Sequence, residues 1–200
     1  ETNGIPGHEK KIREMMINEL EPVVDEFLYD RLGSVIAKKT GSSDGPKIML
    51  AGHMDEVGFI VTKIEDDGFI RVQVIGGFWS QVVLAQLVTI TTKTGEVFYG
   101  VTGSKPPQLL TPEEKNKAFD IKELFIDIGV KDKAKVEELG IKPGDQVTPY
   151  TQFRVMADEK YLLAKAWDDR IGCLIGIEVA KSLQKIEHPN ELYVVGTVQE

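Results

Sequence analysis

The chain has 200 residues, of which 42% are hydrophobic and 28% charged, a composition that excludes a disordered or fibrous protein. Its formal net charge of −8 at pH 7 argues against nucleic acid as the main partner, because phosphate contacts require clustered Lys and Arg. No apolar run approaches the roughly 20 residues that a membrane-spanning helix needs, and the single cysteine, Cys173, leaves no partner for an intrachain disulfide.

The first elements predicted along the chain are a helix and three strands. Residues 8–20 place Ile12, Met15, Met16 and Leu20 on one face, which is the pattern of an amphipathic helix. Strands are expected at 23–29, 34–39 and 47–51. The last is a buried strand that runs directly into Gly52-His53-Met54-Asp55. Because ligands in open α/β sheets collect outside the carboxyl ends of the strands, this strand end is a candidate site.

Two hairpin signals mark a different region after about residue 57. The turns are Asp66-Asp67-Gly68 and Thr94-Gly95. The strands expected to flank them are 58–64, 69–75, 86–92 and 96–101. Short β segments continue to about residue 156, interrupted by a helix at about 132–139 that ends at Gly140. We interpret residues 58–156 as a small β-rich domain.

An α/β pattern returns after this region, with a long helix expected at 168–185 and a buried strand at 191–196. The predicted fold class is therefore α/β, and residues 1–57 and 157–200 are two segments of one domain around the β-rich insert. One helix and one strand are too few to complete a sheet. We therefore expect the α/β domain to be incomplete here and the native protein to be longer.

Three polar groups at strand or helix ends could support chemistry. His53 and Asp55 lie two residues apart, so an extended chain points them to the same side, and a metal-bound His usually donates its other ring N–H to a carboxylate. The same His-x-Asp could also be a surface turn. Asp168 and Asp169 open a helix, where a carboxylate caps backbone N–H groups or binds metal. Glu200 follows a buried strand. It could be a metal ligand, a general base or a solvated loop residue.

Together, these sites favour a metal hydrolase in which a carboxylate bridges two cations about 3.5–4 Å apart. On this interpretation His53 and Asp168 lie within about 8 Å of each other, although they are far apart in the chain. Cys173 lies in an apolar helical segment without an activating His, and we interpret it as a small buried side chain.

Six motifs, in order along nearly the whole chain, resemble those of the glutamyl and deblocking aminopeptidases, whose larger members form tetrahedral dodecamers. They are Gly4-Ile5-Pro6-Gly7-His8-Glu9, Ala51–Gly58, Gly103–Pro107, Phe125–Gly129, Lys165–Arg170 and Gly196–Glu200. Each motif alone is weak, but their ordered combination is specific.

The resemblance implies a metallopeptidase-type mixed sheet flanked by helices, with the β-rich insert as a dimerisation domain. It implies that His53 is a terminal ligand of one metal, that Asp55 orients His53, that Asp168 bridges two metals and that Glu200 is the general base. Two divalent ions, Zn²⁺ or Co²⁺, follow from the family and suit a mixed His and carboxylate donor set. The family's remaining ligands, a second Glu, an Asp and a His, would lie beyond these residues.

The function expected from this resemblance is a cytoplasmic metal-dependent aminopeptidase that acts on short peptides, with a preference for acidic N-terminal residues as one possibility. Its partners would be peptides and further copies of itself, in a dodecamer built from dimers, with neither nucleic acid nor membrane. The alternatives are an endoglucanase-type glycoside hydrolase, which needs a carboxylate pair and no metal, and an inactive assembly fragment.

Overall fold

The computed structural model describes residues 1–200, which form two compact units. The α/β unit contains Thr2–Glu56 and Ala166–Glu200, and the barrel unit contains Glu1 and Val57–Lys165. The expected boundary at residues 156 and 157 is wrong. Residues 157–165 belong to the barrel unit because β10 (Arg154–Val155) and β11 (Leu162–Leu163) pair as an antiparallel hairpin.

The α/β unit is built on a four-stranded mixed sheet, as predicted. Its strands are β1 (Glu26–Tyr29), β2 (Val35–Lys39), β12 (Leu192–Thr197) and β3 (Ile48–His53), in the order β1-β2-β12-β3. The central strand β12 runs antiparallel to β2 and parallel to β3. Strands that lie far apart in the chain are therefore neighbours, and the carboxyl ends of β12 and β3 lie side by side at the same end of the sheet.

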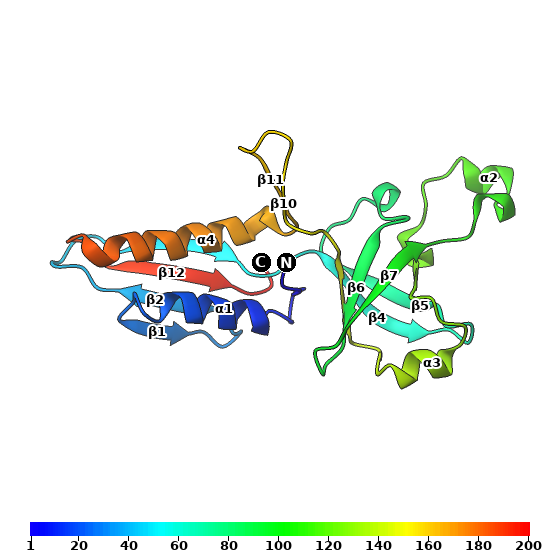
Figure 1. Ribbon diagram of the computed structural model, residues 1–200, viewed down its shortest axis with the longest axis horizontal. Coiled ribbons are helices and arrows are strands. Elements are labelled where there is room, and N and C mark those ends of the chain that lie inside the picture. The colour runs from blue at the N-terminus through cyan, green and yellow to red at the C-terminus, as the bar shows by residue number, and fades with distance from the viewer. The chain divides into compact units, whose positions relative to one another are not determined.

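Two helices pack on one face of this sheet (Figure 1). Helix α1 (Lys10–Leu20) lies beside β2, and α4 (Trp167–Ser182), extended by a 3-10 turn at Leu183–Lys185, lies along β3 and β12. The predicted apolar face of α1 is confirmed for Ile12, Met16 and Leu20, but it is wrong for Met15, which is 54% exposed. The buried core comprises Ile12, Met16 and Leu20 from α1, Val35 and Ala37 from β2, Cys173, Ile177 and Ala180 from α4, and Leu192 and Val194 from β12.

Strand β3 is less buried than its apolar sequence predicts. Ile48 is 42% exposed and Met49 is 68% exposed, whereas β12 is largely buried as expected. The reason is position, because β3 lies at the edge of the sheet and pairs with β12 alone.

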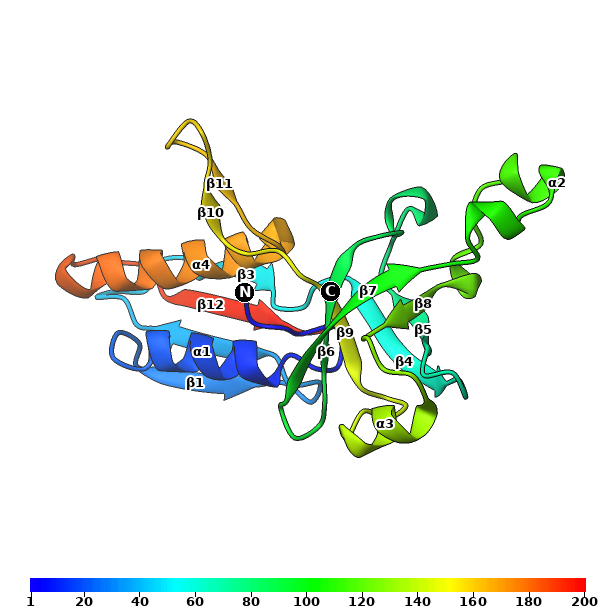
Figure 2. The ribbon, with the colours of Figure 1, turned by 45° about the vertical axis from the view of Figure 1, so that its right-hand side comes forward.

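Besides the β10–β11 hairpin, the barrel unit contains a closed barrel of six strands in the order β4-β5-β8-β7-β6-β9. Figure 2 labels these strands. They are β4 (Gly58–Ile64), β5 (Ile70–Ile75), β6 (Leu87–Thr91), β7 (Val97–Gly103), β8 (Phe125–Asp127) and β9 (Gln146–Pro149). The helices are α2 (Pro112–Lys115) and α3 (Lys133–Glu138), and 3-10 turns occupy Ser80–Val82, Pro107–Leu109 and Ile121–Glu123. Both predicted hairpins are present, as β4–β5 and β6–β7. The barrel has its own core around Phe59, Ile70, Ile90, Ile126 and Val147.

Candidate functional site

His53 and Asp168 come together at the end of the sheet, and their predicted proximity is confirmed. His53 is the last residue of β3, and Asp168 lies at the start of α4. The His53 Nε2 atom is 3.1 Å from Asp168 Oδ1. The His53 side chain is only 13% exposed, whereas that of Asp168 is 97% exposed. One half of the pair is therefore held in the protein, and the other faces solvent.

Asp55 contacts the opposite side of the same imidazole. The His53 Nδ1 atom is 3.5 Å from Asp55 Oδ1 and 3.2 Å from the Asp55 backbone oxygen. Both partners are acceptors, so they favour the tautomer with the proton on Nδ1. The Nε2 lone pair then points at the Asp168 carboxylate.

The lone pairs of His53 Nε2 and Asp168 Oδ1, 3.1 Å apart, repel each other unless a proton or a cation lies between the two atoms. Two ligands of one tetrahedral Zn²⁺, each about 2.0–2.1 Å from the metal, are about 3.3 Å apart. The spacing of His53 Nε2 and Asp168 Oδ1 therefore fits an Nε2–H hydrogen bond to the carboxylate and, when the proton is on Nδ1, a shared divalent cation. A complete protein site needs more donors than this pair, and no group of three or more His, Cys, Asp and Glu side chains is arranged to hold a metal ion here.

The two aspartates that open α4 have different surroundings. Asp168 has extended backbone angles, with φ −89° and ψ 109°. Asp169 Oδ1 instead accepts the Gly172 backbone N–H at 3.1 Å, which is the bond of a helix cap. The capping interpretation thus describes Asp169, and the carboxylate of Asp168 is directed to His53.

Glu200 reaches the same strand end through its backbone. Thr197, the last residue of β12, pairs with His53 in the parallel ladder. The Glu200 N–H then donates to Asp55 Oδ1 at 3.2 Å. All four residues predicted to form the site are therefore brought into one neighbourhood, with Asp55 linking His53 to Glu200.

Arg170 and Glu56 are structural partners that the sequence did not indicate. The Arg170 guanidinium donates to the backbone oxygens of Met54 at 2.8 Å and Thr2 at 2.6 Å, and to Glu56 Oε1 at 3.3 Å. Burial lowers the pKa of Arg170, and the Glu56 charge opposes that shift. Both residues belong to motifs of the resemblance described above. Because they are 114 positions apart, no local sequence pattern predicts that they pair.

Cys173 is buried beneath the site, which confirms its interpretation as a small core side chain. It is 4% exposed, and its Sγ lies 3.6 Å from the His53 backbone oxygen. Burial, followed by the Asp169 charge, raises the pKa of the thiol to about 11. A thiol with that pKa is protonated at neutral pH and is a poor nucleophile.

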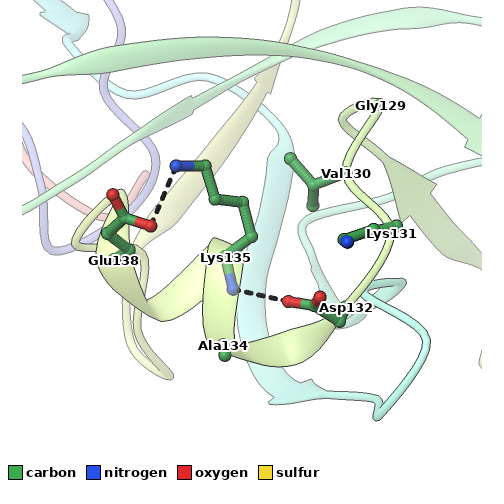
Figure 3. A pocket seen from close by; sticks show the side chains of 7 residues that line it. All are labelled: Gly129, Val130, Lys131, Asp132, Ala134, Lys135 and Glu138. Carbon is green, nitrogen blue, oxygen red and sulfur yellow. Dashed lines mark hydrogen bonds and ion pairs between the residues drawn. The ribbon is translucent and has the colours of Figure 1, made fainter.

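A pocket in the barrel unit does not offer comparable chemistry. It lies in the barrel unit beside α3 and has a volume of about 580 Å³ (Figure 3). Three of its charged side chains already have partners, since Lys135 Nζ contacts Glu138 Oε2 at 2.8 Å and Asp132 Oδ1 accepts the Lys135 backbone N–H at 2.8 Å. None of the helices combines the length and apolar character required to cross a membrane.

Several named proteins match the whole chain. FrvX of Escherichia coli K12 is 41% identical over 100% of this chain and 55% of its own length. The lysyl aminopeptidase of Pyrococcus furiosus is 35% identical, and the glutamyl aminopeptidase of Lactococcus lactis is 34% identical, each over 100% of this chain and 57% of its own length. The chain thus spans about half the length of these relatives.

Solved structures match the fold over the same extent. A TET aminopeptidase from a marine sediment thaumarchaeon superposes with a TM-score of 0.94 at 40% identity, covering 100% of this chain and 56% of the other. The TET1 peptidase of Pyrococcus horikoshii, described as assembling into a tetrahedron or a large octahedral shell, has a TM-score of 0.85 at 32% identity, covering 100% and 58%. A Thermotoga maritima structure titled as an endoglucanase has a TM-score of 0.82 at 30% identity, covering 100% and 57%.

The family model described as M42 glutamyl aminopeptidase matches residues 33–200. That match includes His53, Asp55, Asp168 and Glu200, the four residues that the fold gathers at the end of β3 and β12. The chain therefore belongs to the M42 glutamyl aminopeptidase family.

Proposed function

We propose that these residues form the first part of a metal-dependent aminopeptidase that removes N-terminal residues from short peptides. The observation that carries the proposal is the position of the His53 ring, between Asp55 and Asp168, at a strand end of an M42 chain. Neighbouring strand ends are where α/β sheets place ligand sites, and the Glu200 backbone joins the same cluster.

His53 Nε2 and Asp168 Oδ1 are the atoms of this chain that would hold a divalent cation. We propose two ions per subunit, Zn²⁺ or Co²⁺, with Asp168 shared between them, because mixed imidazole and carboxylate donors suit such metals. When bound, these ions would supply Lewis acidity and a water molecule of lowered pKa. The relatives are nearly twice as long as this chain, and the further ligands are expected in the part that these residues do not cover.

Glu200 is the proposed general base. It would accept a proton from the attacking water and return it to the leaving amine, which typically contributes about 10²–10⁴ in rate. Asp55 would keep the His53 ring in the tautomer that exposes Nε2, and its bond to the Glu200 N–H would set the base beside the metal ligand.

The preferred N-terminal residue is proposed to be acidic, following the family description. Two relatives of nearly equal identity carry the names lysyl and glutamyl aminopeptidase. Paired assays with Glu and Lys substrates would therefore decide this point.

For assembly, we propose a homo-oligomer in which the barrel unit makes the dimer contact and dimers build a dodecamer. A related TET1 peptidase that assembles into a tetrahedron supports this proposal.

Short peptides are the proposed substrates, and the net charge of −8 disfavours nucleic acid. We propose the cytoplasm as its location, which accords with a chain whose one cysteine is buried and unpaired.

The glycosidase alternative is less well supported. Its chemistry requires two carboxylates about 5–9.5 Å apart and no metal, and it assigns no part to an imidazole placed between two aspartates. The two proposals differ in their response to a chelator.

The test uses the full-length protein and the variant Glu200→Gln. Chelation should abolish hydrolysis of a Glu or Leu chromogenic substrate, and Zn²⁺ or Co²⁺ should restore it. Glu200→Gln should keep its metal content and lose about 10²–10⁴ in kcat, because the amide cannot accept the proton. Chelator-resistant cellulose hydrolysis would instead support the glycosidase, and loss of metal in Glu200→Gln would make Glu200 a ligand.

A further inference from the structure

Glu9 is a buried carboxylate to which the proposed mechanism assigns no role. It directly precedes α1 and is only 4% exposed. A carboxylate at such a position commonly accepts an N–H group of the helix's first turn. Glu9 makes no such capping bond, so its burial is not explained by stabilisation of α1.

The Glu9 side chain instead bonds to the turn before α1 and to the end of β12. Its Oε1 accepts the Gly7 N–H at 2.8 Å and the Gln199 N–H at 3.1 Å. The second bond spans 190 positions of the chain. It joins the first recognised motif, Gly4–Glu9, to the last, Gly196–Glu200.

Two carboxylates therefore hold two consecutive peptide N–H groups. Glu9 accepts the N–H of Gln199, and Asp55 accepts the N–H of Glu200. Gln199 has φ +56°, a left-handed conformation that a residue with a Cβ adopts only where the surroundings enforce it. Two successive anchors of this kind determine the direction in which the residue after Gln199 leaves the strand.

We infer that Glu9 is a positioning residue for Glu200, the proposed base, and the inference therefore rests on the proposed function. The Glu9 carboxylate holds the Gln199 peptide in its left-handed turn, and this turn sets the position from which the Glu200 backbone reaches Asp55 at the strand end beside His53. Glu9 itself touches neither substrate nor metal. Its loss should therefore reduce turnover through Glu200 while the affinity for metal and substrate is kept.

The test is a double-mutant cycle in the full-length enzyme with Glu9→Ala and Glu200→Gln. Alone, Glu9→Ala should lower kcat by about 10- to 100-fold, since a displacement of about 1 Å can cost 10²-fold. KM and metal content should stay close to wild type, whereas the melting temperature should fall by a few degrees because the Gly7 and Gln199 N–H groups lose their acceptor. Combined with Glu200→Gln, Glu9→Ala should cost almost nothing further, because residues that act as one unit are non-additive. Glu9→Gln keeps an acceptor oxygen and should recover most of the loss.

The control is Glu14→Ala on the exposed side of α1, where Glu14 pairs only with Lys10 at 3.8 Å. It should leave kcat unchanged. A Glu9→Ala enzyme with normal kcat, a full additional loss in the double variant, or loss of metal or of folding would each overturn the positioning role. If Glu200→Gln alone is fully active, the proposed base is wrong, and the positioning role of Glu9 is wrong with it. If Glu200→Gln is inactive and Glu9→Ala is fully active, only the positioning role is wrong.

Discussion

At the scale of single residues, the site depends on carboxylates that hold other groups in place. Asp55 is 4% exposed and faces both His53 Nδ1 and the Glu200 N–H. Such outer-shell partners set the tautomer and basicity of a metal-binding imidazole. Burying this carboxylate is tolerable because it has polar partners on two sides.

Asp55→Ala in the full-length enzyme should weaken metal affinity by about 10- to 100-fold, because the His53 ring loses its carboxylate partner and keeps only the backbone oxygen of residue 55 as an acceptor for Nδ1. Titration against a fluorescent Zn²⁺ chelator would measure this change. Asp44→Ala, at an exposed position of the same unit, should leave the affinity unchanged. Equal affinity in both variants would exclude Asp55 from the support of the ligand.

Glu191 should make stability depend on acid pH. A hydrogen bond from Tyr193, then bonds from Lys38 and Lys47, lower the pKa of Glu191 from 4.5 to about 2. A carboxyl whose pKa is lower in the folded state stabilises the protein above its unfolded pKa and loses that contribution as pH falls toward its folded pKa. The stabilisation should therefore be complete above about pH 4.5 and disappear toward pH 2.

The corresponding variant is Glu191→Gln, which removes the charge and keeps the size. Thermal melts should show it less stable than wild type at pH 7, with the difference shrinking as the pH falls from 4.5 toward 2. A difference that stays constant over that interval would show that the Glu191 charge does not contribute. Glu113→Gln, at an exposed position, provides a matched comparison.

At the scale of elements, the site depends on the close approach of α4 to β3. A Cβ on Gly52 would lie 2.6 Å from the Cys173 nitrogen and 2.9 Å from the Gly172 carbonyl carbon. Both are backbone atoms of α4, so a larger residue cannot be accommodated by a side-chain rotation. Glycine at this position is what allows the start of α4 to bring Asp168 to His53.

Gly52→Ala should therefore destabilise the protein by about 1–3 kcal/mol, the usual cost of overpacking, and weaken metal binding. Denaturant unfolding and metal titration would measure the two effects. Gly77→Ala serves as the control, because a Cβ there meets nothing within 4 Å. Unchanged stability and metal affinity in Gly52→Ala would show that α4 can move without disturbing the site.

At the scale of the whole molecule, the sheet of the α/β unit has an accessible edge. Strand β3 pairs with β12 on one side only, in parallel register, and parallel strands normally lie inside a sheet with both faces covered. Exposed Met49 and Ile48 lie on this strand. Unpaired N–H and C=O groups on such an edge favour association.

The 200-residue chain expressed alone should therefore associate or be poorly soluble, bind metal weakly and lack aminopeptidase activity. His53 and Asp168 are two donors, and water would fill the other positions of any bound ion. Light scattering, metal titration and a Leu chromogenic substrate with Co²⁺ would test the three expectations. A monomer with strong metal-dependent activity would place the active site elsewhere.

The sequence by itself predicted most of the elements and the residues of the candidate site. The spacing of Ile12, Met15, Met16 and Leu20 predicted α1, although Met15 is exposed. The turns at Gly68 and Gly95 predicted two hairpins, and His53, Asp55, Asp168 and Glu200 stood out at element ends. These are local signals, because periodicity and turn preference act over a few residues. The ordered motifs also identified the family.

Only the tertiary structure decided which distant groups meet. The parallel pairing of β12 with β3 brings Glu200 to Asp55, and the approach of α4 to Gly52 brings Asp168 to His53. The same folding buried Glu9 against Gln199 and Arg170 against Glu56, and it separated the capping role of Asp169 from the exposed Asp168. Apart from the local cap made by Asp169, these contacts arise from packing between segments more than 100 positions apart, where no short-range pattern identifies the partner. The edge position of β3 and the extra residues 157–165 of the barrel unit were decided in the same way, by which strands pair.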